Sequence, residues 1–218
     1  MICMVIGKIR TWFLNRDDKY DVAICFLVVL QFAVIYLAYR INDLPRLFWF
    51  CNHTPFILAL LLYFRKKYII KGIINIGLIF QFLWTIDFIS KALFGFYLTG
   101  TTRYLFEGSF GWLIIIPVLI HIFSTNLALY FTYDSKPNIK ALFYSLIYII
   151  VIYGITLSFT SIETNINCVR TICGVSYSFD TYTNYWPALA FFLIVIPTQL
   201  IQFVFYKIFA EKTWFVNK

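Results

Sequence analysis

Two residue types that perform acyl transfer stand out in an otherwise apolar chain, a cysteine and a deeply placed histidine. Cys51 opens the sequence CNHT, and His121 follows Pro117 by one helical turn. A thiol becomes a nucleophile when a base takes its proton, and histidine is the usual base. We therefore predict that Cys51 attacks an acyl ester to form a thioester, while His121 takes the thiol proton and later returns it.

The choice of base depends on spacing along the predicted helices. His53 is two residues from Cys51, which places the two side chains on nearly opposite faces of one helix. His121 belongs to another helix and is the better partner. Their expected depths below the outer membrane boundary differ, at about 6 Å for Cys51 and about 15 Å for His121 from the rise per residue. A bend at Pro117 could narrow that difference.

Four further residues are candidates for supporting this chemistry. Asn52 and Thr54 could donate hydrogen bonds to the oxyanion of the intermediate. Ser124 falls one turn after His121 and shares its face. Asp87 has two interpretations, an orienter of a histidine or an ion pair with the lysine one turn later. His121 itself could instead serve only as a hydrogen-bonding residue between helices.

These residues fall in or beside stretches that are long and apolar enough to cross a membrane. Of the 218 residues, 61% are hydrophobic and 13% are charged, against roughly 45–50% and about 25% in soluble domains. A span needs about 20 mostly apolar residues. Six stretches qualify, over residues 22–39, 47–64, 72–89, 110–131, 141–159 and 186–206. The sequence therefore predicts a single integral membrane domain over residues 1–218, an all-α polytopic helix bundle with about six transmembrane helices.

The distribution of Lys and Arg predicts the orientation in the membrane. Thirteen of these 18 residues adjoin the span ends on the side of the termini, and five adjoin the opposite ends. Because cytoplasmic loops are enriched in Lys and Arg, we predict a cell-membrane protein with both termini in the cytoplasm. The net charge of +8 then suits anionic lipid headgroups, so we expect membrane lipids as partners and no nucleic acid. The sequence predicts no oligomeric state.

Two cysteines lie in the long loop predicted on the outer side, Cys168 and Cys173. In an oxidising compartment they could form a disulfide that closes a small loop. The sequence contains no Cys and His spacing of a zinc site and no glycine-rich phosphate loop. We therefore expect neither a metal nor a cofactor.

Short pieces of sequence spread over roughly residues 40 to 208 together form a pattern typical of one membrane-protein family. They are Leu44-Pro45, Cys51-Asn52, His121, Pro137 and Asn165-Ile166-Asn167. This pattern resembles the YwaF-type family of six-span integral membrane proteins, whose relatives include a cysteine-dependent membrane phospholipid acyltransferase. The resemblance implies a lipid acyltransferase or lipid hydrolase that uses Cys51 and His121. Trp49 stands where the family usually has a histidine, and Thr54 keeps open a variant found in more distant lipid hydrolases, which use a threonine nucleophile.

Two functions of other classes use the same residues. A small transporter or substrate-binding membrane subunit would use His121, Gln199 and Asp87 as ligand contacts, with no covalent step. A non-catalytic membrane scaffold would use its polar residues only for packing, and the shared face of Gln199 and Gln202 favours bonds between helices. Replacing Cys51 by serine separates binding from catalysis, because a binding subunit tolerates the change and an enzyme loses turnover.

Overall fold

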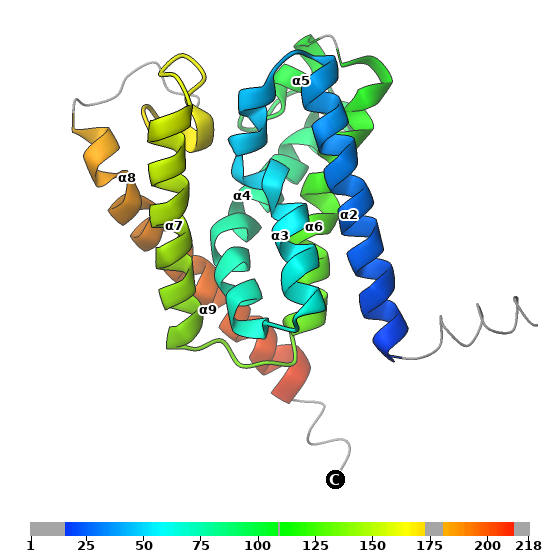
Figure 1. The fold of residues 1–218 in the computed structure, drawn as a ribbon, viewed down its shortest axis with the longest axis vertical. Coiled ribbons are helices and arrows are strands. Elements are labelled where there is room, and N and C mark those ends of the chain that lie inside the picture. The colour runs from blue at the N-terminus through cyan, green and yellow to red at the C-terminus, as the bar shows by residue number, and fades with distance from the viewer. Residues whose placement is uncertain (1–15, 109, 173–180, 212–218) are drawn as a thin grey trace, which may run out of the picture.

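The protein is an all-α helix bundle, which confirms the predicted fold class (Figure 1). The computed structural model describes residues 16–108, 110–172 and 181–211, and these contain no strand. Its α-helices are α2 (Arg16–Arg40), α3 (Phe50–Tyr63), α4 (Lys67–Phe94), α5 (Arg103–Glu107), α6 (Ile115–Thr132), α7 (Ile139–Phe159), α8 (Tyr182–Ala190) and α9 (Ile196–Phe205). The 3₁₀ segments are η1 (Leu44–Phe48), η2 (Gly111–Ile114) and η3 (Ile166–Cys168), and the π-helical segments are η4 (Phe191–Val195) and η5 (Tyr206–Glu211).

Five helical segments have the length and apolarity of membrane spans. They cover Asp18–Arg40, Lys67–Phe94, Gly111–Thr132, Ile139–Phe159 and Tyr182–Ala210. Large apolar side chains are exposed on the outside of the bundle, such as Phe32 at 68% and Leu193 at 68%. Such a surface suits lipid rather than water. The helices are therefore those of a membrane protein.

The predicted span over residues 47–64 is divided in the structure. Pro45 lies in the first turn of η1, and Trp49 then takes an extended conformation with φ −60° and ψ 135°. Helix α3 begins only after this break and has 14 residues. At about 1.5 Å per residue it is about 21 Å long, shorter than the roughly 30 Å hydrocarbon core of a bilayer. The sixth crossing therefore depends on η1 and α3 together and stays a prediction.

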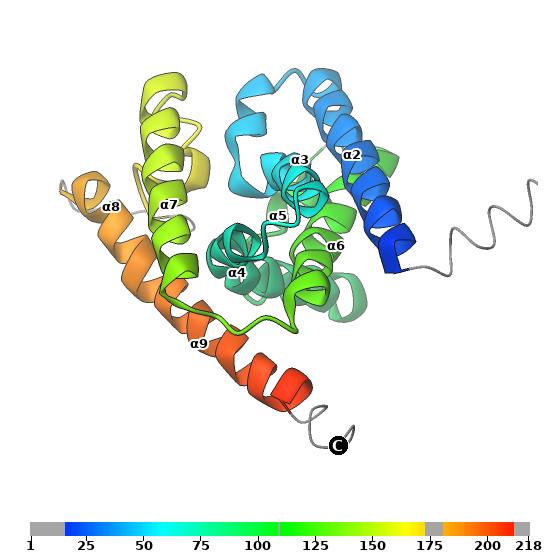
Figure 2. The ribbon, with the colours of Figure 1, turned by 60° about the horizontal axis from the view of Figure 1, so that its bottom comes forward.

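Helix α4 is the centre of the bundle, and it packs against α3, α6, α7 and α9 (Figure 2). Helix α2 covers α3 and α6 on one side. On the other side, α8, η4, α9 and η5 form one long helical run, which lies against α7 and α4. The start of α2 and the end of η5 lie at the same end of the bundle (Figure 1). Residues on α4 are therefore in reach of most of the fold.

Close approach of α3 to α4 depends on one glycine, Gly77. A Cβ atom at this position would lie 2.6 Å from the Phe50 ring and 3.3 Å from Oγ1 of Thr125. Glycine is needed where another side chain packs this closely against a helix backbone. Gly77 thus sets the spacing at which α3 and α6 meet α4.

Candidate functional site

Cys51 lies in the first turn of α3 and is a half-buried free cysteine. Its Sγ donates a weak hydrogen bond to Oδ1 of Asn52 at 3.6 Å. Around it, Cys51 packs against an apolar cluster of α2 and α6 that includes Leu30, Val34 and Ile120. The thiol is therefore held in apolar surroundings, with an amide oxygen rather than a base as its hydrogen-bond partner.

His121 lies on α6, and its side chain is buried, at 8% exposure. Its Nδ1 is 2.8 Å from the carbonyl oxygen of Pro117. A carbonyl can only accept, so Nδ1 carries a proton, and Nε2 has a free lone pair whenever the ring is neutral. The ring stacks on Trp84 of α4, with centroids 3.9 Å apart and planes at 10°. The stack on Trp84 and the bond to Pro117 therefore fix the ring plane of His121 and the proton on Nδ1.

No hydrogen bond joins Cys51 to His121 in the part of the chain that the structure describes. Each forms its bond within its own helix, although Cys51 packs against the apolar cluster that includes Ile120, the residue before His121. The structure thus places the two predicted catalytic residues without pairing them. Acyl transfer between them stays a prediction.

The residues predicted to support an oxyanion donate to backbone carbonyls instead. Nδ2 of Asn52 donates to the carbonyl of Arg46 at 2.8 Å, and Oγ1 of Thr54 donates to the carbonyl of Phe50. His53 has its Nδ1 3.3 Å from the carbonyl of Leu47. The bonds of Asn52 and His53 tie the start of α3 to η1, whereas the Thr54 bond lies within α3.

Asp87 anchors the turn that follows α4. Its fully buried carboxylate accepts hydrogen bonds from the backbone N–H groups of Thr99 (2.6 Å), Gly100 (3.1 Å) and Thr102 (2.9 Å), and from the hydroxyls of Thr101 (3.4 Å) and Thr102 (2.6 Å). Lys91, its predicted ion-pair partner, donates to the carbonyl of Gly95 instead. Asp87 therefore holds the turn after α4, and it contacts neither Lys91 nor a histidine by a hydrogen bond.

A layer of polar side chains lies between α4 and α6, beside His121. Oε1 of Gln81 accepts from the backbone N–H of Thr125 at 3.3 Å and from its hydroxyl. Nε2 of Gln81 and Oγ of Ser124 are buried, and neither has a hydrogen-bond partner among the described residues. Gln81 and Trp84 are three residues apart on α4, as are His121 and Ser124 on α6, so each pair shares a face. The Gln81–Thr125 bond and the Trp84–His121 stack bring these two faces together.

The indole of Trp84 adds a third donor to this layer. Its buried Nε1–H lies near the Tyr104 hydroxyl, but no hydrogen bond of normal geometry reaches it. Trp84 also stacks on Phe88 at 5.6 Å, and Phe88 stacks on Phe106 at 5.7 Å. This row of rings connects the polar layer to α5, where burial raises the pKa of Tyr104. The α4–α6 polar layer (Gln81, Trp84, His121 and Ser124) is our candidate site.

Sequence reasoning singled out His121 and Ser124 and missed Gln81 and Trp84 as members of this site. The available signal was their own spacing, because a glutamine and a tryptophan one turn apart in an apolar span present donors on one face. The spacing does not indicate which neighbouring helix that face contacts. The residue types could therefore be noticed, but not their partners.

A second polar layer connects α4, α7 and α9. Nδ2 of Asn75 donates to Ser145 at 3.1 Å and to Gln199 at 2.9 Å, and Nε2 of Gln202 donates to Oδ1 of Asn75 at 2.6 Å. Both glutamines thus bond between helices, as their shared face indicates. Buried Lys71 is 3.5 Å from Oε1 of Gln202. This layer is largely satisfied internally, unlike the layer beside His121.

The loop after α7 is built on two asparagines with positive φ, Asn165 (39°) and Asn167 (55°). Asn165 closes the loop on itself through the backbone N–H groups of Arg170 and Thr171. Oδ1 of Asn167 accepts from the first backbone N–H of α3, that of Phe50, at 2.7 Å. Asn167 therefore caps a helix more than a hundred residues earlier in the chain.

The structure describes only one of the two cysteines of the predicted disulfide. Cys168 is disulfide-bonded, and Cys173 lies outside the described residues. No group of three side chains that could hold a metal ion occurs within residues 16–108, 110–172 and 181–211. Comparison with protein-family models, curated proteins and solved structures finds no match to this chain.

Proposed function

We propose that the protein binds a small carbonyl-containing molecule without covalent chemistry at the α4–α6 polar layer, as a substrate-binding or transport subunit would. The observation that carries this proposal is the pair of buried donors without partners, Nε2 of Gln81 and Oγ of Ser124, beside His121. A buried polar group left unpaired costs about 1–3 kcal/mol. A ligand that accepts from both donors would recover that free energy.

The hydrogen-bonding atoms without partners in this layer define the chemistry of the ligand. One carbonyl oxygen has two lone pairs, which can accept from Gln81 and Ser124 together. The free lone pair on Nε2 of His121 can accept a proton donor on the same ligand. A protonated carboxylic acid or a primary amide offers both groups on one carbon. The apolar helices around the layer favour an apolar tail.

A binding subunit is expected to use His121, Gln199 and Asp87 as ligand contacts. Of these three, His121 is the one proposed to contact the ligand, through Nε2. Gln199 bonds to Asn75, and Asp87 holds the turn after α4. Gln81 and Ser124 take their place in the proposal. Ionisable groups deep in membrane helices are often functional, which supports a role for His121 beyond packing.

The test is ligand-dependent thermal unfolding of the purified protein in detergent. Decanoic acid at low pH and decanamide should raise the unfolding temperature, whereas decane, which lacks the carbonyl, should not. Ser124→Ala and His121→Phe should each remove the effect. Ser158→Ala, at an exposed position of α7, is the matched control and should retain it. Equal stabilisation by decane, or an undiminished effect in both site variants, rejects the proposal.

Acyl transfer at Cys51 is the second candidate function. The observation that favours it is the position of a free thiol in the first turn of α3, where a helix N-terminus stabilises the thiolate. The apolar cluster around Cys51 has the opposite effect. In this reaction Sγ would bond to the acyl carbon of a lipid ester while the alcohol leaves with the thiol proton, carried by His121.

A long-chain nitrophenyl ester distinguishes the two functions. An enzyme should release nitrophenolate and gain the mass of one acyl group at Cys51, and Cys51→Ser and His121→Ala should slow this by orders of magnitude. A binding protein should show the same slow background rate in all three forms. Wild-type turnover that survives Cys51→Ala excludes the thioester.

A further inference from the structure

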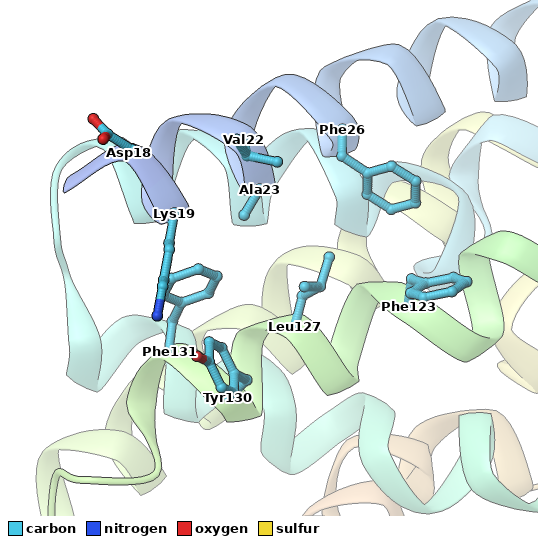
Figure 3. Close-up of a pocket in the computed structure, with 9 residues that line it drawn as sticks. All are labelled: Asp18, Lys19, Val22, Ala23, Phe26, Phe123, Leu127, Tyr130 and Phe131. Atoms are coloured by element: carbon cyan, nitrogen blue, oxygen red, sulfur yellow. The ribbon is translucent and has the colours of Figure 1, made fainter. Parts of the chain in front are cut away.

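An apolar groove lies between α2 and α6, near the end of the bundle where α2 begins (Figure 3). It encloses about 380 Å³, within the range of about 300–1,000 Å³ typical of ligand sites. Its walls are aliphatic and aromatic, formed by Val22, Ala23, Phe26, Phe123, Leu127 and Phe131. Val22 and Phe123 are partly exposed, at 36% and 40%. The groove therefore opens on the side of the bundle, where the acyl chains of a bilayer would lie.

The groove has polar groups at one end only. In Figure 3 the Lys19 side chain extends toward Tyr130 and Phe131, whereas the Asp18 carboxylate points away from the groove. Lys19 and Tyr130 are both exposed. The guanidinium of Arg65, in the connection from α3 to α4, lies 4.4 Å from the centre of the Tyr20 ring beside this end of α2. The apolar groove thus ends at a rim where the Lys19 ammonium faces the groove and the Asp18 carboxylate faces away from it.

We propose that the groove binds one acyl chain of an anionic phospholipid, with the lipid phosphate at the ammonium group of Lys19. The apolar walls match the chain, and the cation at the rim matches the charge of the headgroup. Ala23 is small enough to leave the hollow that the chain fills. This site shares no residue with the α4–α6 polar layer and does not depend on the proposed function.

Lipid retention measured by native mass spectrometry tests the headgroup contact. The detergent-solubilised protein is equilibrated with equimolar phosphatidylglycerol and phosphatidylcholine of identical chains. Wild type should retain phosphatidylglycerol over phosphatidylcholine by about fivefold, the preference expected for one lysine. Lys19→Gln should remove the preference. Lys140→Gln, the same change at an exposed lysine of α7 outside the groove, should leave it intact.

A second pair of variants tests the chain-binding part. Val22→Trp places a large ring in the groove and should abolish retention of both lipids. Val151→Trp, at a 45% exposed position of α7, is its control and should retain both. Unfolding temperatures near that of wild type show that each variant is folded.

Three outcomes overturn the proposal. One is an equal effect of Lys19→Gln and Lys140→Gln on the lipid preference, and another is unchanged retention in Val22→Trp. The third is a change of oligomeric state in Val22→Trp without loss of lipid, which would assign the groove to a second copy of the chain.

Discussion

At the scale of single residues, the α4–α6 polar layer combines satisfied and unsatisfied groups within two helical turns. Thr125 donates to Gln81, and His121 is fixed by Pro117 and Trp84. Ser124, next to Thr125 in the chain, has a buried hydroxyl without a partner. Two neighbouring hydroxyls on one helix therefore have opposite energetic roles.

We expect Ser124→Ala to leave the unliganded protein as stable as wild type or up to about 1 kcal/mol more stable, because it removes an unpaired buried hydroxyl. Thr125→Val should lower stability by about 1–2 kcal/mol, because it takes a donor from Oε1 of Gln81. Reversible unfolding in mixed micelles measures both. A larger loss for Ser124→Ala than for Thr125→Val would contradict the hydrogen-bond assignment.

The residue types at the site were predictable and their partners were not. His121 and Ser124 are conspicuous because polar groups are rare in this chain, and their three-residue spacing fixes a shared face. The spans, however, are apolar nearly all round, so the pattern does not define how α4 and α6 are rotated toward each other. Trp84 and Gln81 become neighbours of His121 only through that rotation. Pairing Cys51 with His121 required the same information.

At the scale of elements, two interactions position α3: a close contact with α4 and a hydrogen bond that caps its first turn. Gly77 lets the Phe50 ring lie against α4, and Asn167 accepts from the first N–H of α3. The apolar length of residues 47–64 predicted a helix there, since length and apolarity are local properties. The break at Trp49 was not predicted, because it is stabilised by Asn167 from a distant loop, which also donates to the carbonyl of Phe48.

Gly77→Ala should destabilise the protein by about 1–3 kcal/mol, because the new Cβ overlaps the Phe50 ring and forces α3 away from α4. Gly154→Ala is the matched control, since nothing lies within 4 Å of its Cβ position on α7. There the higher helix propensity of alanine should leave stability unchanged or slightly raised. Equal unfolding temperatures for the two variants would refute the close contact.

Asn167→Ala should cost about 2–3 kcal/mol, because it removes the cap of α3 and the bonds to Phe48 and Thr156. Asn167→Asp keeps an acceptor for the N–H of Phe50 but loses both donated bonds, so an intermediate loss is expected. Thermal unfolding ranks the variants. If Asn167→Asp were no better than Asn167→Ala, the cap would contribute little.

At the scale of the whole molecule, the path of the chain bears on the number of crossings. Helix α2 ends and α4 begins at opposite ends of the bundle, so η1 and α3 together return the chain across it (Figure 1). The five long helical segments and this shorter return place the ends of the described chain on one side. That this side faces the cytoplasm stays a prediction from the distribution of Lys and Arg.

Accessibility to a membrane-impermeant maleimide tests that orientation. On a background without native exposed thiols, Lys66→Cys in the α3–α4 turn should react only after cells are opened. Thr101→Cys, in the turn held by Asp87, should react in intact cells. The reverse pattern would contradict the predicted orientation, and labelling of both in intact cells would mean that α4, which lies between the two positions, does not cross.

The π-helical segment η4 determines which way the polar side chains of α9 face. Each residue of an α-helix turns the chain by about 100°, so the one extra residue wound into a π turn rotates everything after it by about that angle. Gln199 and Gln202 follow η4 and meet Asn75 in this rotated register. Regular winding through residues 191–195 would turn both amides by about that angle away from Asn75 on α4. This local underwinding thus acts as an angular offset that keeps the last helix bonded to the centre of the bundle.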